Sequence, residues 1–271
     1  MTELIRKSVG ELLADRALEM PNHEALVYPD RGLRYTYREF NEVCEQVAKG
    51  LMAIGIEKGE NVAVWASNIP EWVSLQYGTG KMGAVLVTVN TNYRAAELEY
   101  LLKQSDSTTI FLIEDYKGNS YIDTIYELCP ELKYCRPGEL QSKRLTKLKN
   151  VVVFSEKDYP GTYKWSDVIT LSTQVTNTQL EERMAELKPD DVINMQYTSG
   201  TTGFPKGVML THSNLTNNGF NIAKCMKLTE EDRLCIPVPF FHCFGCVIGT
   251  LAAVSVGATM VPVQEFDAET V

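Results

Sequence analysis

The segment from Tyr197 to Gly207 has the composition of an anion-binding loop. It reads YTSGTTGFPKG, in which seven of eleven residues are Thr, Ser or Gly and Lys206 is the single cation. Glycine permits backbone conformations closed to other residues, so that successive amides can surround an anion. The hydroxyls add donors and Lys206 adds a positive charge. These are the properties that a polyphosphate-binding loop needs.

The loop differs from the common nucleotide-binding loop, which needs Gly-Lys-Ser/Thr in succession. Here Pro205 precedes Lys206 and Gly207 follows it. The segment Val208–His212 is apolar and partly β-branched, which predicts a strand after the loop, with a helix only from about Ser213. We therefore expect loop amides and hydroxyls, and not the start of a helix, to hold the phosphates.

Two other patterns resemble sites and have simpler structural explanations. Gly78-Thr-Gly80-Lys-Met-Gly83 matches the dinucleotide fingerprint, but it closes a predicted helix and leads into a strand, whereas a true fingerprint follows a strand and opens a helix. Close helix packing and a chain turn explain these glycines. Cys243-Phe-Gly-Cys246 has metal and redox spacing but no second ligand pair, so we interpret it as small helix positions.

Composition limits the partners and the compartment. Lys plus Arg number 26 and Asp plus Glu 35, which gives a net charge of −9 and argues against nucleic acid. The basic run from Lys133 to Lys149 is expected to be a solvated, mobile surface connector. Seven cysteines without framework spacing, and an N-terminus without a secretory pattern, predict a reducing, cytoplasmic location.

The stretch from Leu234 to Gln264 carries no charge and is long enough to cross a bilayer, which takes roughly 20 apolar residues. Prolines at 237, 239 and 262 interrupt it, Gly257 divides it, and no positive cluster flanks it. We therefore predict a strand, a buried helix and a second strand here, and no membrane span.

Helical and strand patterns alternate along the chain, which predicts an α/β fold. Ser8–Glu11 and Thr36–Glu39 have the spacing of capping boxes at helix starts. Continuous apolar runs predict buried strands of a mostly parallel sheet at 61–66, 84–89, 108–113, 151–154, 192–195, 234–238 and 259–263. Helical patterns are predicted from Pro70 and at 95–104, 120–128, 178–187, 213–226 and 244–256.

The segment QYTSGTTGFPKGVMLTHSNLTNN resembles the signature of the adenylate-forming enzymes, the superfamily of acyl-CoA synthetases, peptide-synthetase adenylation domains and luciferases. The upstream segment from Thr36 to Leu102 and the downstream VPFFHCFG resemble the same family. The resemblance extends from about Ser8 to Pro262. It implies layered αβαβα architecture, with a first sheet and its helices at about 59–212, a second half at 213–271, and residues 1–58 packed on that half.

The resemblance also implies a role for particular residues. His242 matches the histidine at the acyl pocket, which Phe241 and Gly245 would border, although a lone histidine in such a run is more often a satisfied core residue. The residues that match the loop over the β- and γ-phosphates of ATP are Thr198, Ser199, Gly200, Thr201, Thr202, Gly203 and Lys206.

The run after His242 resembles fatty-acyl-CoA ligases more than amino-acid-activating domains. Small residues at 245, 249, 252 and 253 are expected to leave room for an alkyl chain, and an aryl acid would also suit the cavity. The implied activity joins a carboxylic acid to coenzyme A through an acyl-adenylate, with ATP and Mg²⁺.

The chain ends at Val271, near half of the family's usual length. We expect an N-terminal part without the adenine-stacking segment, the ribose-binding acid, the magnesium-associated glutamate and the lysine-bearing C-terminal domain, and therefore without thioester formation of its own. Two alternatives remain: a non-catalytic module that self-associates through an uncovered apolar face, and an enzyme that transfers the acyl group to a carrier protein.

Overall fold

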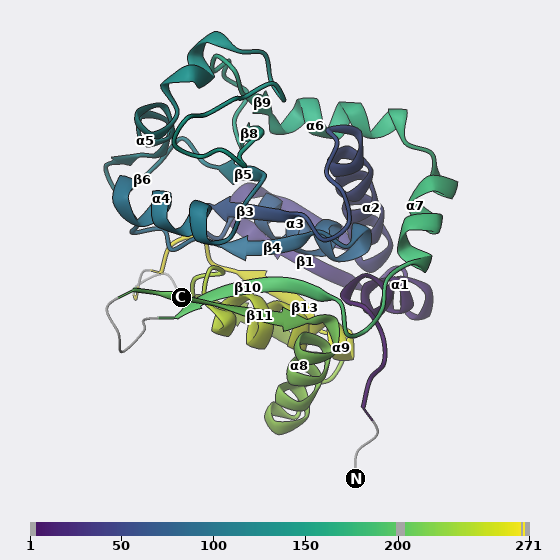
Figure 1. The fold of residues 1–271 in the computed structure, drawn as a ribbon. Helices are drawn as coiled ribbons and strands as arrows, with labels where there is room; N and C mark the ends of the chain where they lie inside the picture. Colours follow the sequence, from purple (N-terminus) through teal and green to yellow (C-terminus); the bar gives the residue numbers. More distant parts are fainter. Residues whose placement is uncertain (1–3, 199–203, 267, 269–271) are drawn as a thin grey trace.

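The computed structural model describes residues 4–198, 204–266 and 268. Two mostly parallel sheets and their helices build a mixed α/β fold, as predicted (Figure 1). The larger sheet has the strand order β11-β10-β4-β3-β5-β8-β9, and only the β10–β11 pair is antiparallel. Its strands are β3 (Asn61–Trp65), β4 (Val85–Thr88), β5 (Thr109–Leu112), β8 (Asn150–Val153), β9 (Tyr163–Lys164), β10 (Val192–Thr198) and β11 (Lys206–Thr211).

The smaller sheet joins both ends of the chain. Its order is β12-β13-β1-β2, with β1 (Glu24–Tyr28) parallel to β13 (Thr259–Pro262) and antiparallel to β2 (Leu33–Thr36). Strand β12 (Arg233–Ile236) pairs in parallel with β13. Strands β1 and β2 were not among the predicted elements. A separate hairpin pairs β6 (Asp115–Tyr116) with β7 (Asn119–Ser120).

The helices pack against the two sheets and against one another. They are α1 (Val9–Glu19), α2 (Tyr37–Ala53), α3 (Pro70–Met82), α4 (Ala95–Gln104), α5 (Tyr121–Leu128), α6 (Trp165–Leu171), α7 (Asn177–Ala185), α8 (His212–Met226) and α9 (Ala252–Val256). The 3-10 turns are η1 (Pro29–Arg31), η2 (Pro130–Tyr134) and η3 (Ser172–Gln174), and the π-helix η4 (Phe244–Leu251) precedes α9. Both predicted capping boxes form, at Ser8 and at Thr36.

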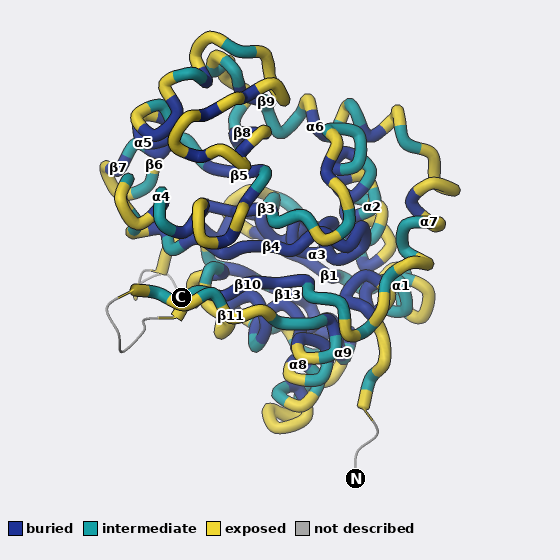
Figure 2. Tube along the Cα trace, viewed as in Figure 1, coloured by how far each residue is buried: buried dark blue, intermediate teal, exposed yellow. Residues whose placement is uncertain are grey.

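Side chains of the larger sheet alternate between two cores. In β3, Val62 and Val64 face one core with α2, α3 and the smaller sheet, while Ala63 and Trp65 face the other with α4 and α5. The central strands are buried on both faces (Figure 2), which explains why they read as continuous apolar runs. Helix α3 packs in the core that the larger and the smaller sheet share. All of its residues are buried except Glu71, which is partly exposed.

The glycine pattern in α3 serves helix packing, as predicted. A Cβ on Gly78 would lie 2.5 Å from Val47 Cγ1 of α2, and one on Gly80 would lie 3.2 Å from Val9 Cγ1 of α1. Gly83 ends the helix at φ +83°, in the left-handed region that favours glycine. The fingerprint match is therefore a contact surface between helices.

The connector from 129 to 150 is anchored and not loose, contrary to expectation. Its leucines at 132, 140, 145 and 148 are buried in the second core, while its basic side chains are exposed. The uncharged stretch from 234 to 264 forms a strand, a helical segment and a strand, as predicted. In the part of the chain that the structure describes, no helix is both long and apolar enough to cross a membrane.

Candidate functional site

The predicted phosphate loop connects the two strands of an antiparallel hairpin. Thr198, the last residue of β10, pairs with Lys206, the first residue of β11, and both are exposed. Directly paired residues present their side chains on the same face of a sheet. The Thr198 hydroxyl and the Lys206 ammonium group therefore stand together at the base of the loop. Ser199, Gly200, Thr201, Thr202 and Gly203 lie outside the described residues.

Helix α4 supports the hairpin, a contact that the sequence patterns did not reveal. The Tyr100 ring stacks on Phe204 with centroids 5.3 Å apart, and the Tyr100 hydroxyl donates to the Pro205 carbonyl at 3.1 Å. On the other strand, the Tyr197 hydroxyl donates to Gln104. A Cβ on Gly207 would lie 3.1 Å from Gln104 Oε1, so Gly207 allows this close approach. Helix α4 thus fixes both sides of the loop's base.

The second predicted site follows β12 in the smaller sheet. His242 is exposed, Phe241 is half-buried, and the neighbouring Phe240 is buried at 1% exposure. The Phe244 amide donates to His242 Nδ1 at 3.1 Å. Because a backbone amide can only donate, the neutral ring must carry its proton on Nε2. The fold therefore presents His242 Nε2 as a donor.

The helix after His242 is partly π-helical, and its small residues are contact positions. A Cβ on Gly245 would lie 2.4 Å from the Pro239 carbonyl oxygen, and one on Gly249 would lie 2.8 Å from Ile236 Cγ2. Glycine is thus needed for close packing at both positions, whatever role they have toward a ligand. π-Helical turns are often found at functional sites.

A side-chain hydrogen bond joins the segments that flank the two predicted sites. Gln196 of β10 donates through Nε2 to Cys246 Sγ in η4 at 3.2 Å, and its Oε1 accepts from the Thr88 hydroxyl at 3.2 Å. Burial raises the pKa of the Cys246 thiol to about 12, so the sulfur stays protonated at neutral pH. The strand that leads into the predicted phosphate loop is therefore tied to the helix that follows His242.

The described residues hold no cluster of three or more His, Cys, Asp or Glu side chains that could bind a metal ion. The pair Cys243 and Cys246 accordingly has no ligand partners among them, and both thiols are free. Cys246 is buried in helix packing.

A polar cavity of about 360 Å³ opens at the carboxyl ends of β3, β5 and β8. Ser67, Glu114 and Phe154, which follow these strands, line it together with Glu71 and Gln264. Ligands of open α/β sheets bind in crevices at this edge. The residues lining this cavity do not include Thr198, Lys206, Phe241, His242 or Gly245.

Comparison with protein families matches residues 13–271 to the family described as AMP-binding enzyme. A Bacillus subtilis (strain 168) protein named "Putative acyl-CoA synthetase YngI" is 58% identical over 271 residues, which are 100% of this chain and 49% of that protein. The rat "Medium-chain acyl-CoA ligase ACSF2, mitochondrial" is 37% identical over 264 residues, which are 96% of this chain and 43% of that protein. The chain spans about half the length of these curated relatives.

The fold is similar to that of a solved structure. The inhibitor-bound N-terminal domain of FACL13 from Mycobacterium tuberculosis superposes with a TM-score of 0.75 at 26% identity, over 97% of this chain and 58% of that one.

Proposed function

Because the chain belongs to the AMP-binding enzyme family, we propose that it carries the phosphate-binding part of an ATP-dependent acid–thiol ligase. In the proposed reaction an oxygen of the carboxylate attacks the α-phosphorus of ATP and pyrophosphate leaves. The thiol of coenzyme A then attacks the carbonyl carbon and AMP leaves. Mg²⁺ would enter bound to ATP.

The pairing of Thr198 with Lys206 carries this proposal. It places a hydroxyl and a cation on one face of the hairpin, at the base of the glycine-rich loop. Such a loop positions phosphates and neutralises their charge, which is most of what this chemistry asks of a protein. The Gln196–Cys246 hydrogen bond supports a shared site, since it links this hairpin to the segment that presents His242.

We propose a fatty acid as the carboxylic acid, with Phe241, His242 and Gly245 at its pocket. The names of the relatives, which are acyl-CoA synthetases and ligases, support this choice. An alkyl chain gains about 0.8 kcal/mol for each buried methylene. Affinity that does not rise along a series of straight-chain acids would argue for another acid. The cytoplasmic location stays a prediction from the cysteines.

Calorimetry of ATP·Mg binding to the chain tests the proposed function. We expect binding that weakens in Lys206→Ala and in Thr202→Ala, because each removes a group that the phosphates would contact. Lys147→Ala, which removes an exposed cation in the connector, is the matched control and should bind like the wild type. Equal affinity in all four proteins, or no binding at all, would contradict the proposal for this chain.

We also propose that the chain self-associates through the edge of the larger sheet. Strand β11 is the edge strand beside β10, and Phe204, Val208 and Met209 at this edge are 67%, 41% and 63% exposed. An apolar edge strand offers both unpaired backbone groups and apolar surface to a second copy.

A further inference from the structure

The segment that presents His242 is held by a side chain from the turn between β3 and α3. Asn68 is only 4% exposed. Its Nδ2 donates to the carbonyl oxygens of Val238 at 2.9 Å and Val263 at 3.1 Å, and its Oδ1 accepts from the Phe240 amide at 2.8 Å. Both amide protons and the oxygen are thus used on the backbone that follows β12 and β13. A single side chain connects the carboxyl edges of the two sheets.

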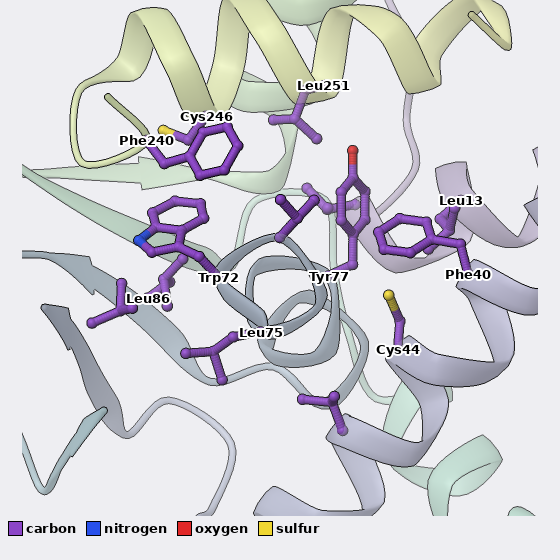
Figure 3. Packing of buried hydrophobic residues seen from close by; sticks show 14 of the residues in the cluster. Leu13, Phe40, Cys44, Trp72, Leu75, Tyr77, Leu86, Phe240, Cys246 and Leu251 are labelled. Atoms are coloured by element: carbon purple, nitrogen blue, oxygen red, sulfur yellow. The ribbon is translucent and has the colours of Figure 1, made fainter. Parts of the chain in front are cut away.

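Helix α3, which begins two residues after Asn68, also contacts this segment. The Trp72 ring lies 5.0 Å from the Phe240 ring, and Figure 3 shows it on the side of α3 that faces Phe240 and Cys246. Gln76 donates through Nε2 to the Cys246 carbonyl at 2.8 Å, and its Oε1 lies 3.0 Å from the Thr250 hydroxyl, which donates to the same carbonyl at 2.6 Å. Positions 72 and 76 are one helical turn apart, so they share a face of α3.

His242 lies between Phe240, which Asn68 holds, and Cys246, which Gln76 of α3 holds. Phe240 precedes it by two residues and Cys246 follows it by four. The His242 amide donates to the Pro239 carbonyl at 3.2 Å, and the His242 carbonyl accepts from the amides of Gly245 at 2.9 Å and Cys246 at 3.2 Å. This turn brings the Phe244 amide to Nδ1. The direction of the exposed imidazole therefore depends on backbone that Asn68 and Gln76 fix from either side.

We propose that Asn68 and Gln76 are positioning residues that fix the orientation and tautomer of His242. The proposal rests on the proposed function, which places His242 at the acyl pocket. Neither residue needs to touch a ligand: Asn68 holds the backbone two residues before the histidine, and Gln76 holds the backbone four residues after it. Trp72 adds apolar contact between the two polar ones.

Nitrogen-15 spectra of the histidine rings in the 271-residue chain test the proposal. The chain has three histidines, at 23, 212 and 242, so His242→Gln assigns the signal of interest. In the wild type, we expect the signals of a neutral His242 ring that accepts at Nδ1 and carries its proton on Nε2. In Asn68→Ala and in Gln76→Ala, we expect these signals to shift toward those of a free imidazole in tautomeric exchange.

Two controls separate positioning from loss of stability. Asn150 is also buried, at 5% exposure, and donates to Thr109 at 3.1 Å at the amino end of β8. Asn150→Ala should therefore weaken the fold but leave the His242 signals unchanged. The signal of buried His212, in a different part of the fold, reports in each variant whether the chain is folded.

Wild-type His242 signals in folded Asn68→Ala and Gln76→Ala would overturn the proposal. If Asn68→Ala loses the His212 signal, the result for Gln76→Ala decides. A free-imidazole pattern for His242 in Gln76→Ala would then support the proposal, and an unchanged pattern would contradict it. No ATP enters this measurement. A failure here is therefore distinct from a failure of ATP binding, which would instead count against the proposed function.

Discussion

Gln196 and Cys246 meet across the two halves of the fold, with the amide nitrogen 3.2 Å from the thiol sulfur. Gln196 also donates to Asn194 Oδ1 at 3.0 Å and accepts from Thr88. Because Gln196 is only 7% exposed, water cannot readily replace these partners. A polar connection thus runs from the larger sheet into the helix after His242.

Replacing Gln196 by Leu should lower the free energy of unfolding by about 1–3 kcal/mol, since it leaves buried polar groups of Asn194 and Thr88 without a partner. Urea denaturation of the two proteins measures this difference. Gln141→Leu, at an exposed position in the connector, is the matched control and should change stability by less than about 0.5 kcal/mol. Equal stability of Gln196→Leu and the wild type would show that the connection contributes nothing.

The stability of the chain should fall in acid because of His212. This side chain is fully buried and accepts the Val9 amide at Nδ1 at 3.0 Å, which only an unprotonated nitrogen can do. Burial lowers the pKa of His212 to about 4, although the nearby carboxylates of Asp191 and Glu11 oppose this shift and Lys58 reinforces it.

The unfolded chain binds a proton on His212 near its ordinary pKa of 6.5, while the folded chain resists protonation down to about 4. The contribution of His212 to the free energy of unfolding is therefore complete above pH 6.5. It falls by on the order of 3 kcal/mol as the pH decreases toward 4. Denaturation midpoints at several pH values measure the loss.

His212→Asn keeps an acceptor for Val9 without the titrating ring, so its stability should vary less between pH 6.5 and 4. Gln141→Leu, which changes an exposed residue that does not titrate, should retain the wild-type dependence. If His212→Asn loses stability in acid as steeply as the wild type, another group is responsible.

The sequence predicted best those elements whose signal is local. Buried strands such as β3 and β5 were predicted because both of their faces are apolar, and the helix starts at Ser8 and Thr36 because capping boxes depend on four neighbouring residues. Strand β1 was missed although it is as long as β3. It pairs on one side with β2 and on the other with β13, which is more than 200 residues away and gives no local signal.

The same distinction applies to the candidate site. The loop's glycines, hydroxyls and Lys206 lie within one segment of eleven residues, and the sequence alone singled them out. Tyr100, Asn68 and Gln76 act through contacts between distant segments, as in the bond from Asn68 to Phe240, so no spacing rule could identify them. The π-helical form of η4 was also missed, since its apolar pattern also fits an α-helix.

Gly78 should tolerate substitution poorly, because it lies at the contact between α2 and α3. In Gly78→Ala the new Cβ would lie 2.5 Å from Val47 Cγ1, so α2 and α3 would have to separate, at a cost of about 1–3 kcal/mol in unfolding free energy. Gly80→Ala, with its nearest atom at 3.2 Å, is the matched comparison and should cost less.

Adding Val47→Ala to Gly78→Ala should recover part of the loss, because it removes the Cγ1 atom that the new methyl group meets. Thermal unfolding of the single and double variants measures this coupling. If the change in stability of the double variant equals the sum of the changes in the two single variants, steric contact is not the cause.

Self-association through β11 should depend on its apolar side chains. We expect Met209→Lys to reduce the average mass in light scattering, because Met209 is 63% exposed on an edge strand and a lysine there repels a second copy and disfavours apolar contact. Met226→Lys is the matched control, since Met226 is also exposed, at 47%, but ends α8 away from this edge. A wild-type chain that is monomeric at moderate concentration, or a Met209→Lys variant that associates as strongly as the wild type, would exclude β11 as the contact.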